Sequence, residues 1–254
     1  MNIMVFTIIQ ARMNSSRLPG KVLIDVCGTP ELVHVVRRVI RAKTVDRVIV
    51  ATTDTKSDDP IERCCIENNI CFYRGSENDV LDRFYKAALE FNVSENDYIV
   101  RVTADCPFID ADVIDKVINA AIKSKRDYVS NTIKPTYPDG LDIEVFTFKT
   151  LKYAWENAFL KSEREHVTPY IYKNPEKFSL LNVEGLEDLS ELRWTLDEKD
   201  DLDVILSVYN ELYFKDNFFG LRDIIKLFRE RPDIFSKNMS YKRNEGYIKS
   251  LQED

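Results

Sequence analysis

The sequence predicts an α/β fold, a Rossmann-like and mainly parallel sheet with helices on both faces. Short apolar runs alternate with segments of helical periodicity through residues 1–130. The first run, 3–9, is continuously apolar, as expected of a strand that is covered on both faces. Strands that alternate with helices form a parallel sheet, because each helix returns the chain to the same edge. Ligands of such sheets bind beyond the carboxyl ends of the strands, so the residues after each strand are the first candidates for a site.

The elements of the first half follow from their apolar spacing. Four strands are expected, at 3–9, 48–51, 71–73 and 98–102. Helices are expected between them, at about 31–43, from Asp58 or Asp59 onward, at 79–91 and at 110–125. An aspartate stands at the start of the last three helices, where its side chain can cap the free backbone N–H groups. Pro60 fits the first turn of the second helix.

The pattern changes after Tyr128. Turn signals and alternating charges fill 131–145, and short helical stretches follow at about 150–158 and 163–172. A strand is expected again at 192–196, with helices at 199–214 and 219–230. We therefore predict three parts: a nucleotide-binding α/β domain (1–130 and 186–232), an inserted acceptor and dimerisation lobe (131–185) and a solvated tail (233–254).

Composition excludes several classes of protein. The formal net charge of −7 argues against nucleic acid as a partner, and no apolar run approaches the length that spans a membrane. The first residues lack the features of a signal peptide, so we expect a cytoplasmic protein. Five cysteines without metal-type spacing and only two histidines argue against disulfides and against a zinc or His-rich metal centre. A cysteine–histidine nucleophilic pair remains possible on paper.

The most informative stretch is the loop after the first strand, residues 10–21. It contains three cationic residues and no acid, in an otherwise acidic chain: Arg12, Arg17 and Lys21. Two serines, Ser15 and Ser16, add neutral hydrogen-bond donors. Arginine binds phosphate oxygens with paired hydrogen bonds, and lysine adds a compact charge. The spacing is that of neither a Walker loop nor a dinucleotide fingerprint. The loop is therefore a candidate triphosphate cradle, although charge alone also fits a solvated basic loop.

The string at 12–21 resembles a long signature, R-x-x-S-x-R-x-P-G-K, of the CMP-sugar synthetase family. That family includes acylneuraminate and 3-deoxy-manno-octulosonate cytidylyltransferases. The resemblance continues along nearly the whole chain and is greatest to the branch typified by spore-coat polysaccharide biosynthesis proteins. The other similar segments lie at 79–83, 101–107, 137–142, 162–170 and 192–197.

The resemblance implies a fold of the nucleotide-diphospho-sugar transferase type with a small protruding dimerisation lobe. It also implies a cytidylyltransferase that uses CTP and Mg²⁺, forms a homodimer and activates an acidic sugar for surface polysaccharide or glycan synthesis. One stretch departs from the better-studied members: Ser-Glu-Arg-Glu-His at 162–166 belongs to this branch alone. The acceptor of those members therefore cannot be copied to this chain.

Two aspartates are candidate metal ligands. Asp105 and Asp197 each follow an expected strand at its carboxyl end. Mg²⁺ needs only one or two protein carboxylates, because water and substrate phosphates fill its other positions. Each aspartate taken alone also fits a cap of the following turn or helix. The resemblance places both on the metal.

Three further residues are candidates for nucleotide binding. The resemblance suggests that Arg74 and Ser76, which follow the third strand, face the nucleotide. A surface turn is the alternative. Asp82 and Arg83 are neighbours on the next helix and do not share a face. One of the two is expected to point toward the base, and Asp82 is our candidate.

The acceptor candidates lie in the second half. Asp139, Asp142 and Glu144 form an acidic cluster that suits the hydroxyls or an amino group of an acceptor, or else a turn and a solvated strand. Arg164 and His166 are candidates for an anionic acceptor. Ser162 and Glu165 have the spacing of a helix capping box, which also accounts for this stretch.

The proposed chemistry is attack of an acceptor hydroxyl on the α-phosphorus of CTP. Arg12 and Lys21 are assigned to the triphosphate, Asp105 and Asp197 to the metal, and no general base is evident. One rival function is a glycosyltransferase, since 110–112 and 201–203 have the letters D-x-D, although both lie at expected helix starts. The other is a non-catalytic nucleotide-binding protein of the same fold.

Overall fold

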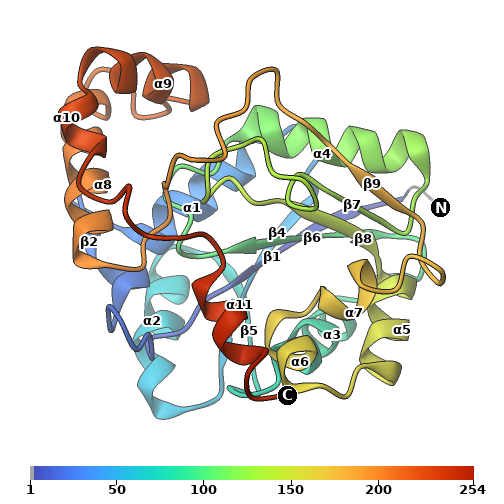
Figure 1. Cartoon of the computed structure of the whole chain (residues 1–254). Helices are drawn as coiled ribbons and strands as arrows, with labels where there is room; N and C mark the ends of the chain where they lie inside the picture. The colour runs from blue at the N-terminus through green and yellow to red at the C-terminus, as the bar shows by residue number, and fades with distance from the viewer. Residues whose placement is uncertain (1–2) are drawn as a thin grey trace.

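The computed structural model describes residues 3–254 and contains one seven-stranded sheet in the order β5-β4-β1-β6-β8-β7-β9 (Figure 1). A second sheet pairs two very short strands, β2 (Asp25–Val26) and β3 (Thr29–Pro30). The seven strands of the main sheet are β1 (Val5–Gln10), β4 (Arg47–Thr53), β5 (Cys71–Gly75), β6 (Tyr98–Thr103), β7 (Tyr128–Ser130), β8 (Glu144–Thr147) and β9 (Leu180–Asn182).

The four strands of the first half are parallel neighbours, which confirms the predicted fold class. In the register, Gln10 at the end of β1 is level with Ala51 of β4 and Thr103 of β6. The loops that leave β1 and β6 therefore start at the same edge of the sheet. The one reversal is β8, which is antiparallel to both β6 and β7.

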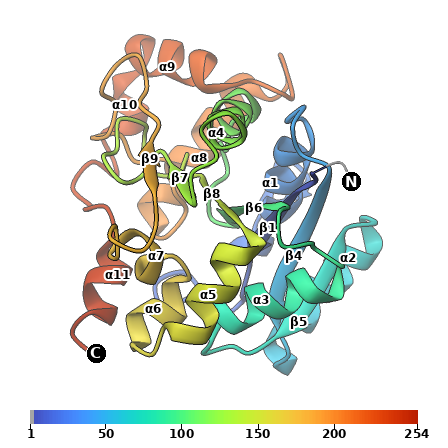
Figure 2. The same cartoon turned by 90° about the vertical axis from the view of Figure 1, so that its right-hand side faces the viewer.

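Helices cover both faces of the sheet (Figure 2). One face packs against helices from both halves of the chain: α1 (Glu31–Ile40), α2 (Asp59–Glu67), α4 (Ala111–Ser124), α8 (Lys199–Leu212) and α9 (Leu221–Glu230). The other face packs against α3 (Val80–Glu90), α5 (Phe148–Asn157) and α7 (Pro169–Tyr172), with α6 (Lys161–His166) beside α3. Shorter helices are η1 (Lys21–Leu23), η2 (Lys56–Asp58), α10 (Pro232–Phe235) and α11 (Glu245–Ser250).

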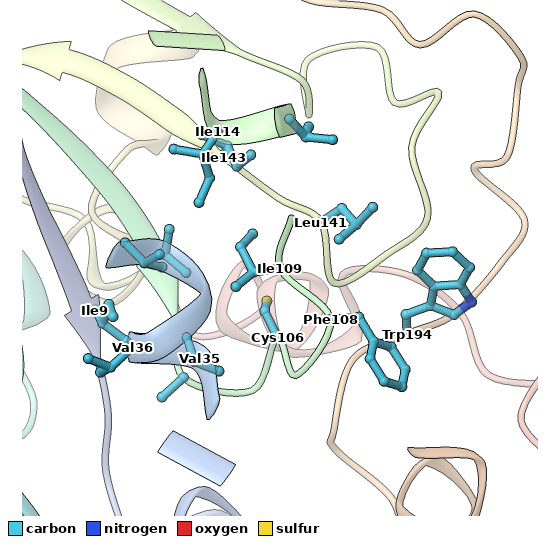
Figure 3. Close-up of a cluster of buried hydrophobic side chains, with 14 of the residues drawn as sticks. Ile9, Val35, Val36, Cys106, Phe108, Ile109, Ile114, Leu141, Ile143 and Trp194 are labelled. Carbon is cyan, nitrogen blue, oxygen red and sulfur yellow. The ribbon is translucent and has the colours of Figure 1, made fainter. Parts of the chain in front are cut away.

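The larger core joins the two halves of the chain. Ile9 from β1 and Val36 from α1 belong to the same buried cluster as Phe108 and Trp194 (Figure 3). The rings of Phe108 and Trp194 meet edge to face at 6.0 Å. Burial of these large side chains fixes the segment around Trp194 against the end of β6, where the candidate metal ligands lie.

Two expectations for the second half are wrong. Residues 192–196 do not form a strand of the sheet; they make a single bridge, between Arg193 and Asp139. The segment 131–185 is not a lobe apart from the sheet, because β8 and β9 are two of its strands. Both short strands were hidden in the sequence by neighbouring turns and charges, and three or four residues are too few to show a periodicity.

The C-terminal residues do not form a solvated tail. After α10 the chain returns across the sheet to α11, which contacts α6 (Figure 1). Asn238 donates to the Arg193 carbonyl at 3.0 Å and to Asp201 at 2.9 Å. The positive charges of this segment suggested solvent exposure, but Lys237 pairs with Asp203, and Arg243 pairs with Asp139 and Asp142.

Candidate active site

The loop between β1 and η1 is closed by its own backbone. The Met13 carbonyl accepts the N–H groups of Ser15 and Gly20, both at 2.9 Å. Gly20 has φ of 74°, in the left-handed region that glycine adopts without strain. The Met13 N–H donates to the buried carboxylate of Asp58 at 2.9 Å, which ties the loop to the end of β4. Asp58 thus binds this loop and the β4 threonines, and it does not cap α2 through its side chain as expected.

The predicted triphosphate residues differ in how far they are engaged. Arg12 and Ser16 are exposed, and neither makes a side-chain hydrogen bond or salt bridge within residues 3–254. The Ser15 hydroxyl accepts the Leu18 N–H at 3.4 Å. Arg17 turns to Asp197 at 3.0 Å and to Glu198 at 3.2 Å. Arg12 is therefore the cation most open to an incoming phosphate.

Lys21 joins the two predicted metal ligands. Its Nζ lies 2.7 Å from Asp105 Oδ2 and 2.7 Å from Asp197 Oδ1. Burial alone would lower the pKa of Lys21, but the two carboxylates outweigh it and raise that pKa. Burial alone would raise the pKa of Asp105, but the Lys21 ammonium and several hydrogen bonds hold it to about 2. Both shifts favour the charged forms of Lys21 and Asp105.

Asp197 reaches Asp105 through close backbone contacts. The Leu196 N–H donates to the Asp105 carbonyl at 2.8 Å. Gly140, with φ of 103°, lies so close to Trp194 that a Cβ there would stand 2.6 Å from the Trp194 carbonyl. The buried Asp201 carboxylate accepts the Asp197 N–H at 2.9 Å. Hydrogen bonds and close packing thus supply what a sheet strand was expected to supply.

A divalent cation fits between these two carboxylates. A single positive atom, Lys21 Nζ, already lies within 2.7 Å of both Asp105 and Asp197. Oxygen donors are the ligands that Mg²⁺ prefers, and two carboxylates suffice when phosphates and water complete the shell. No group of three or more potential metal-ligating side chains occurs within residues 3–254, so a closed metal cage is absent from the described chain.

The acidic cluster expected to bind the acceptor is paired with arginines. Asp139 lies 3.4 Å from Arg193, and Asp142 bonds to Arg243. Glu144 is buried and pairs with Arg101 across the β6–β8 register. Burial raises the pKa of Asp142 to about 7, against the opposing effect of Arg243. Each carboxylate has a cationic partner that an acceptor would have to share or displace.

Arg164 and His166 have different positions. Arg164 binds Asp79 through two nitrogens and donates to the Trp155 carbonyl at 2.8 Å, so it joins α6 to α3. His166 lies under α11, with Nε2 3.0 Å from the Ser250 hydroxyl. Burial, followed by Arg101, lowers the pKa of His166 to about 4. At neutral pH it therefore offers a hydrogen bond rather than a charge.

The expected capping box of α6 is wrong. Glu163, not Glu165, accepts the backbone N–H groups at the helix start, at 3.2 and 3.3 Å. The Ser162 hydroxyl donates to the side chain of Asp254 at 2.6 Å. Glu165 instead accepts the Ser250 hydroxyl at 2.9 Å. The helix begins at Lys161, two residues earlier than expected, so Ser162 lies in the first turn rather than at the cap position, and there it meets the C-terminal segment.

Two predicted nucleotide contacts are engaged by the protein instead. The Arg74 guanidinium donates to the carbonyls of Thr53 and Thr55. It also forms salt bridges with two acids of α2, Asp59 and Glu62. Asp82 accepts the Trp155 indole N–H at 2.9 Å and pairs with Lys86. Both side chains have partners within the protein, so their contact with the nucleotide stays a prediction.

Ser76 and Arg83 lie closer to the loop side. The Ser76 hydroxyl accepts the Asp79 N–H at 3.1 Å, and the Ser76 carbonyl accepts Arg83 at 2.9 Å. Arg83 is buried and forms no salt bridge within residues 3–254, and its Nε has no partner. Burial, followed by the nearby Arg12, lowers the pKa of Arg83 to about 10. An anion between Arg12 and Arg83 would relieve this repulsion.

Sequence reasoning left four site residues without a role: Arg83, Arg101, Asp201 and Arg243. Arg83 was considered for the base, but its adjacency to Asp82 gave no reason to prefer it. Arg101 lies inside a matching segment at 101–107, which was the one available signal. Asp201 lies at the start of α8, where its only local signal was the D-x-D pattern at 201–203, and Arg243 lies in the expected tail, where nothing local marks it.

The rival chemistries lose their candidate residues. Asp110 caps α4 by accepting the N–H groups of Asp112 and Val113. Asp201 is fully buried against Arg193. Neither D-x-D pair is therefore free to bind a metal. All five cysteines are free thiols, and no cysteine–histidine hydrogen bond occurs within residues 3–254.

This loop, the paired aspartates and their position at one sheet edge agree with a comparison across known families. The family model described as Cytidylyltransferase matches residues 6–241. The chain belongs to the cytidylyltransferase family. It is therefore an enzyme, a CTP-dependent nucleotidyltransferase, and the resemblance found in its sequence is confirmed.

Three relatives illustrate the position of this cytidylyltransferase. It is 34% identical over 240 residues to the spore coat polysaccharide biosynthesis protein SpsF of Bacillus subtilis, over 92% of this chain and 97% of that protein. It is 29% identical over 211 residues to a 3-deoxy-manno-octulosonate cytidylyltransferase of Syntrophobacter fumaroxidans, over 73% and 82%. A solved cytidylyltransferase from Leptospira borgpetersenii shares 33% identity with a TM-score of 0.87, over 93% of this chain and 98% of that one.

The comparison places the enzyme in the spore-coat branch of the CMP-sugar synthetases. The match ends at residue 241, whereas the segment from Lys242 to Asp254 lies over the site. No helix within residues 3–254 is long and apolar enough to cross a membrane.

Proposed function

We propose that the enzyme transfers CMP from CTP to a hydroxyl of an acidic sugar, with Mg²⁺, and releases pyrophosphate. The observation that carries this proposal is the junction of Lys21 with Asp105 and Asp197 at the end of a cationic loop. Nucleotidyl transfer needs positive groups for the triphosphate and carboxylates for a metal in one place. CTP over UTP is expected from the family alone.

The two aspartates are the proposed metal ligands. Bound there, Mg²⁺ would neutralise charge on the phosphates. A cation that contacts both carboxylates competes with the Lys21 ammonium, which lies 2.7 Å from one oxygen of each. We therefore expect Lys21 to leave Asp105 and Asp197 when CTP and metal bind, and to move to the triphosphate.

The loop cations bind and orient the triphosphate. Arg12 is unpaired and exposed, and Arg17 is held by weaker, partly exposed contacts to Asp197 and Glu198. Exposed ion pairs contribute little free energy, so a triphosphate can recruit Arg17 at small cost. Placing the α-phosphorus in line with the acceptor hydroxyl supplies most of the acceleration in such reactions. No side chain is assigned as general base.

The acceptor is proposed to lie on the side of Asp142 and His166. The named activity of the Syntrophobacter relative supports a keto-sugar acid as the leading class. Arg243, Arg101 and Arg193 supply cations there, and neutral His166 supplies a hydrogen bond. Sugar hydroxyls and a carboxylate match this mixture of paired acids and arginines.

The homodimer and the cytoplasmic location remain proposals. Phe159 is 85% exposed, and Leu160 and Tyr153, close to it in the sequence, are also exposed. Apolar side chains grouped on one surface are common at subunit contacts. A two-fold dimer is expected by light scattering at micromolar concentration, and a monomeric mass would contradict it.

A pyrophosphate-release screen tests the function. The purified enzyme with Mg²⁺ is mixed with CTP or UTP and a panel of sugar acids, sugar phosphates and neutral sugars, and products are identified by mass spectrometry. We expect release with CTP and a sugar acid, and at least tenfold less with UTP. A site that hydrogen-bonds the cytosine amine binds UTP poorly, because uracil lacks that amine. Release with neutral sugars alone, or none with any acceptor, would remove the acidic-sugar proposal.

A further inference from the structure

A second cationic hollow lies on the outer side of α1, away from Lys21. His34, Arg37, Arg38 and Arg41 follow the i, i+3, i+4, i+7 spacing, so they share one face of this helix. The hollow has a volume of about 210 Å³. Its wall consists of His34, Arg37, Arg38, Tyr213, Asn217 and Phe218, from α1 and from the connection between α8 and α9.

The positive charge of this face is not balanced. None of Arg37, Arg38 and Arg41 forms a salt bridge within residues 3–254, although the chain carries a net charge of −7. No acid lines the hollow. If charge were spread at random over an acidic protein, unpaired arginines on one face would be unexpected. Salt bridges among the described residues therefore do not explain why this face is positive.

Arg38 is the least explained member. It is 6% exposed, and Nη1 donates to the Phe219 carbonyl at 2.9 Å. Its guanidinium lies over the Phe219 ring at 4.3 Å. Nε donates to the Tyr209 hydroxyl at 3.4 Å, and Nη2 is buried without a hydrogen-bond partner among residues 3–254. A buried guanidinium that has neither a carboxylate nor a full set of acceptors retains an unmet demand for an anion.

The nearest acids do not meet that demand. Glu31 is fully buried, and burial, followed by Asp105, raises its pKa well above the usual range, which favours its neutral form. Asp25 accepts the Gly28 N–H at 3.0 Å. Burial lowers the pKa of His34. The hydrogen bond to the Val26 carbonyl opposes this shift, and the charges of Arg38 and Arg37 add to it. The field inside the hollow is therefore positive.

We propose that this hollow is a second ligand site, which binds the phosphate group of a small phosphorylated molecule. Guanidinium groups bind phosphate oxygens with paired, charge-assisted hydrogen bonds. The Asn217 amide and the ring of Tyr213 complete a wall of donors and flat surfaces. A volume of about 210 Å³ holds a phosphate group but not a whole nucleotide, so the rest of the ligand extends outward past Arg37.

The route outward is also present. Arg37 borders a second hollow of about 350 Å³ that is lined largely by apolar residues, including Val33, Val36 and Ile40. A phosphate ester with its phosphate on Arg38 and Arg37 would place its remaining part along this groove. The site shares no residue with the loop at 10–21, and it stands or falls independently of the proposed acceptor.

The test measures phosphate binding after the catalytic loop has been disabled. Arg12→Ala with Lys21→Ala removes two phosphate ligands of the active site. In that background, inorganic phosphate and a simple monoester, glycerol 3-phosphate, are titrated by calorimetry. Arg37→Gln and Arg41→Gln, both at exposed positions, are added singly, and Arg222→Gln, an exposed arginine on α9, is the matched control.

We expect one saturable phosphate site with a dissociation constant on the order of 1 mM, the range of a few charged hydrogen bonds. Arg37→Gln and Arg41→Gln should each weaken it at least fivefold, and Arg222→Gln less than twofold. Asn217→Asp, which puts a carboxylate in the wall, should abolish binding. Absence of saturable phosphate binding, equal effects of all three arginine variants, or tighter binding of citrate than of either phosphate would overturn the proposal.

Discussion

The two sides of the proposed active site, the candidate phosphate loop and the proposed acceptor side, are assembled in different ways. The loop at 10–21 is one continuous stretch, positioned by β1 and closed by its own backbone. The acceptor side combines β8, α6 and the C-terminal segment. The paired residues Arg243 and Asp142, for example, are 101 residues apart in the chain. A continuous motif is visible in sequence, whereas a site made of distant contacts is visible only after folding.

The two sides also differ in how firmly they are held. Lys21 is buried between Asp105 and Asp197, and the Asp58 carboxylate accepts the Met13 N–H of the loop. The segment over the acceptor side is anchored by polar contacts at its surface, such as the partly exposed pair of Glu245 with Arg17. Contacts of this kind open more easily than buried ones. Nucleotide binding is therefore expected to be rigid and acceptor binding adaptable.

The largest effect is expected from the aspartates of the nucleotide side. Asp105→Asn and Asp197→Asn keep the shape and remove the charge, so metal binding and transfer should fall, with turnover reduced ~100-fold or more. CTP affinity, measured by calorimetry, should change much less, because Arg12 and Arg17 remain. Asp203→Asn, at an exposed position on α8, is the control. Turnover near that of the parent, at the parent's Mg²⁺ requirement, would remove that aspartate from the metal site.

A large effect of two opposite signs is expected at Lys21. Lys21→Met should lower turnover ~100-fold and weaken CTP binding, because a triphosphate ligand is lost. The same change should strengthen Mn²⁺ binding to the CTP-free enzyme, since no ammonium then competes for the two aspartates. Spin resonance of free Mn²⁺ measures this directly, with Lys226→Met on α9 as control. If Mn²⁺ binds the variant no more tightly than the parent, Lys21 does not compete with the metal.

A smaller and selective effect is expected on the acceptor side. Removal of 242–254, or Arg243→Gln, should raise the acceptor KM several-fold and leave CTP affinity within about threefold. The free energy of unfolding should fall by only ~1–2 kcal/mol, the sum of a few partly exposed ion pairs. Lys249→Gln, on α11 in the same segment, is the control. An equal loss of CTP and acceptor binding would contradict the division into two sides.

The smallest effect concerns Asp142 and pH. Its pKa in the folded enzyme is raised to about 7, above that of the unfolded chain. The folded state then binds the proton more tightly, so this residue reduces stability as pH rises from about 4 to above 7. Asp142→Asn lacks this loss, so its stability relative to the parent should be higher at pH 8 than at pH 5 in urea unfolding. A difference that is constant with pH would show that Asp142 is ionised throughout.

The parallel half of the sheet and the position of the loop at 10–21 after its first strand could be predicted from the sequence, and the role of the loop in phosphate binding stays a prediction. Long apolar runs, helical spacing and the string from Arg12 to Lys21 are local signals, and they depend on no distant partner. Asp105 and Asp197 were also found, but for Asp197 the expected strand does not exist. The family pattern, rather than the local structure, identified that residue.

Tertiary structure alone decided the remainder. In the fold, Arg74 and Asp82 hydrogen-bond to other parts of the chain, and the C-terminal segment contacts His166. The fold also places β8 and β9 in the main sheet. The physical reason is common to all of these. Whether a charged side chain is free for a ligand depends on which opposite charge the fold brings to it, and that partner lies far away in the chain.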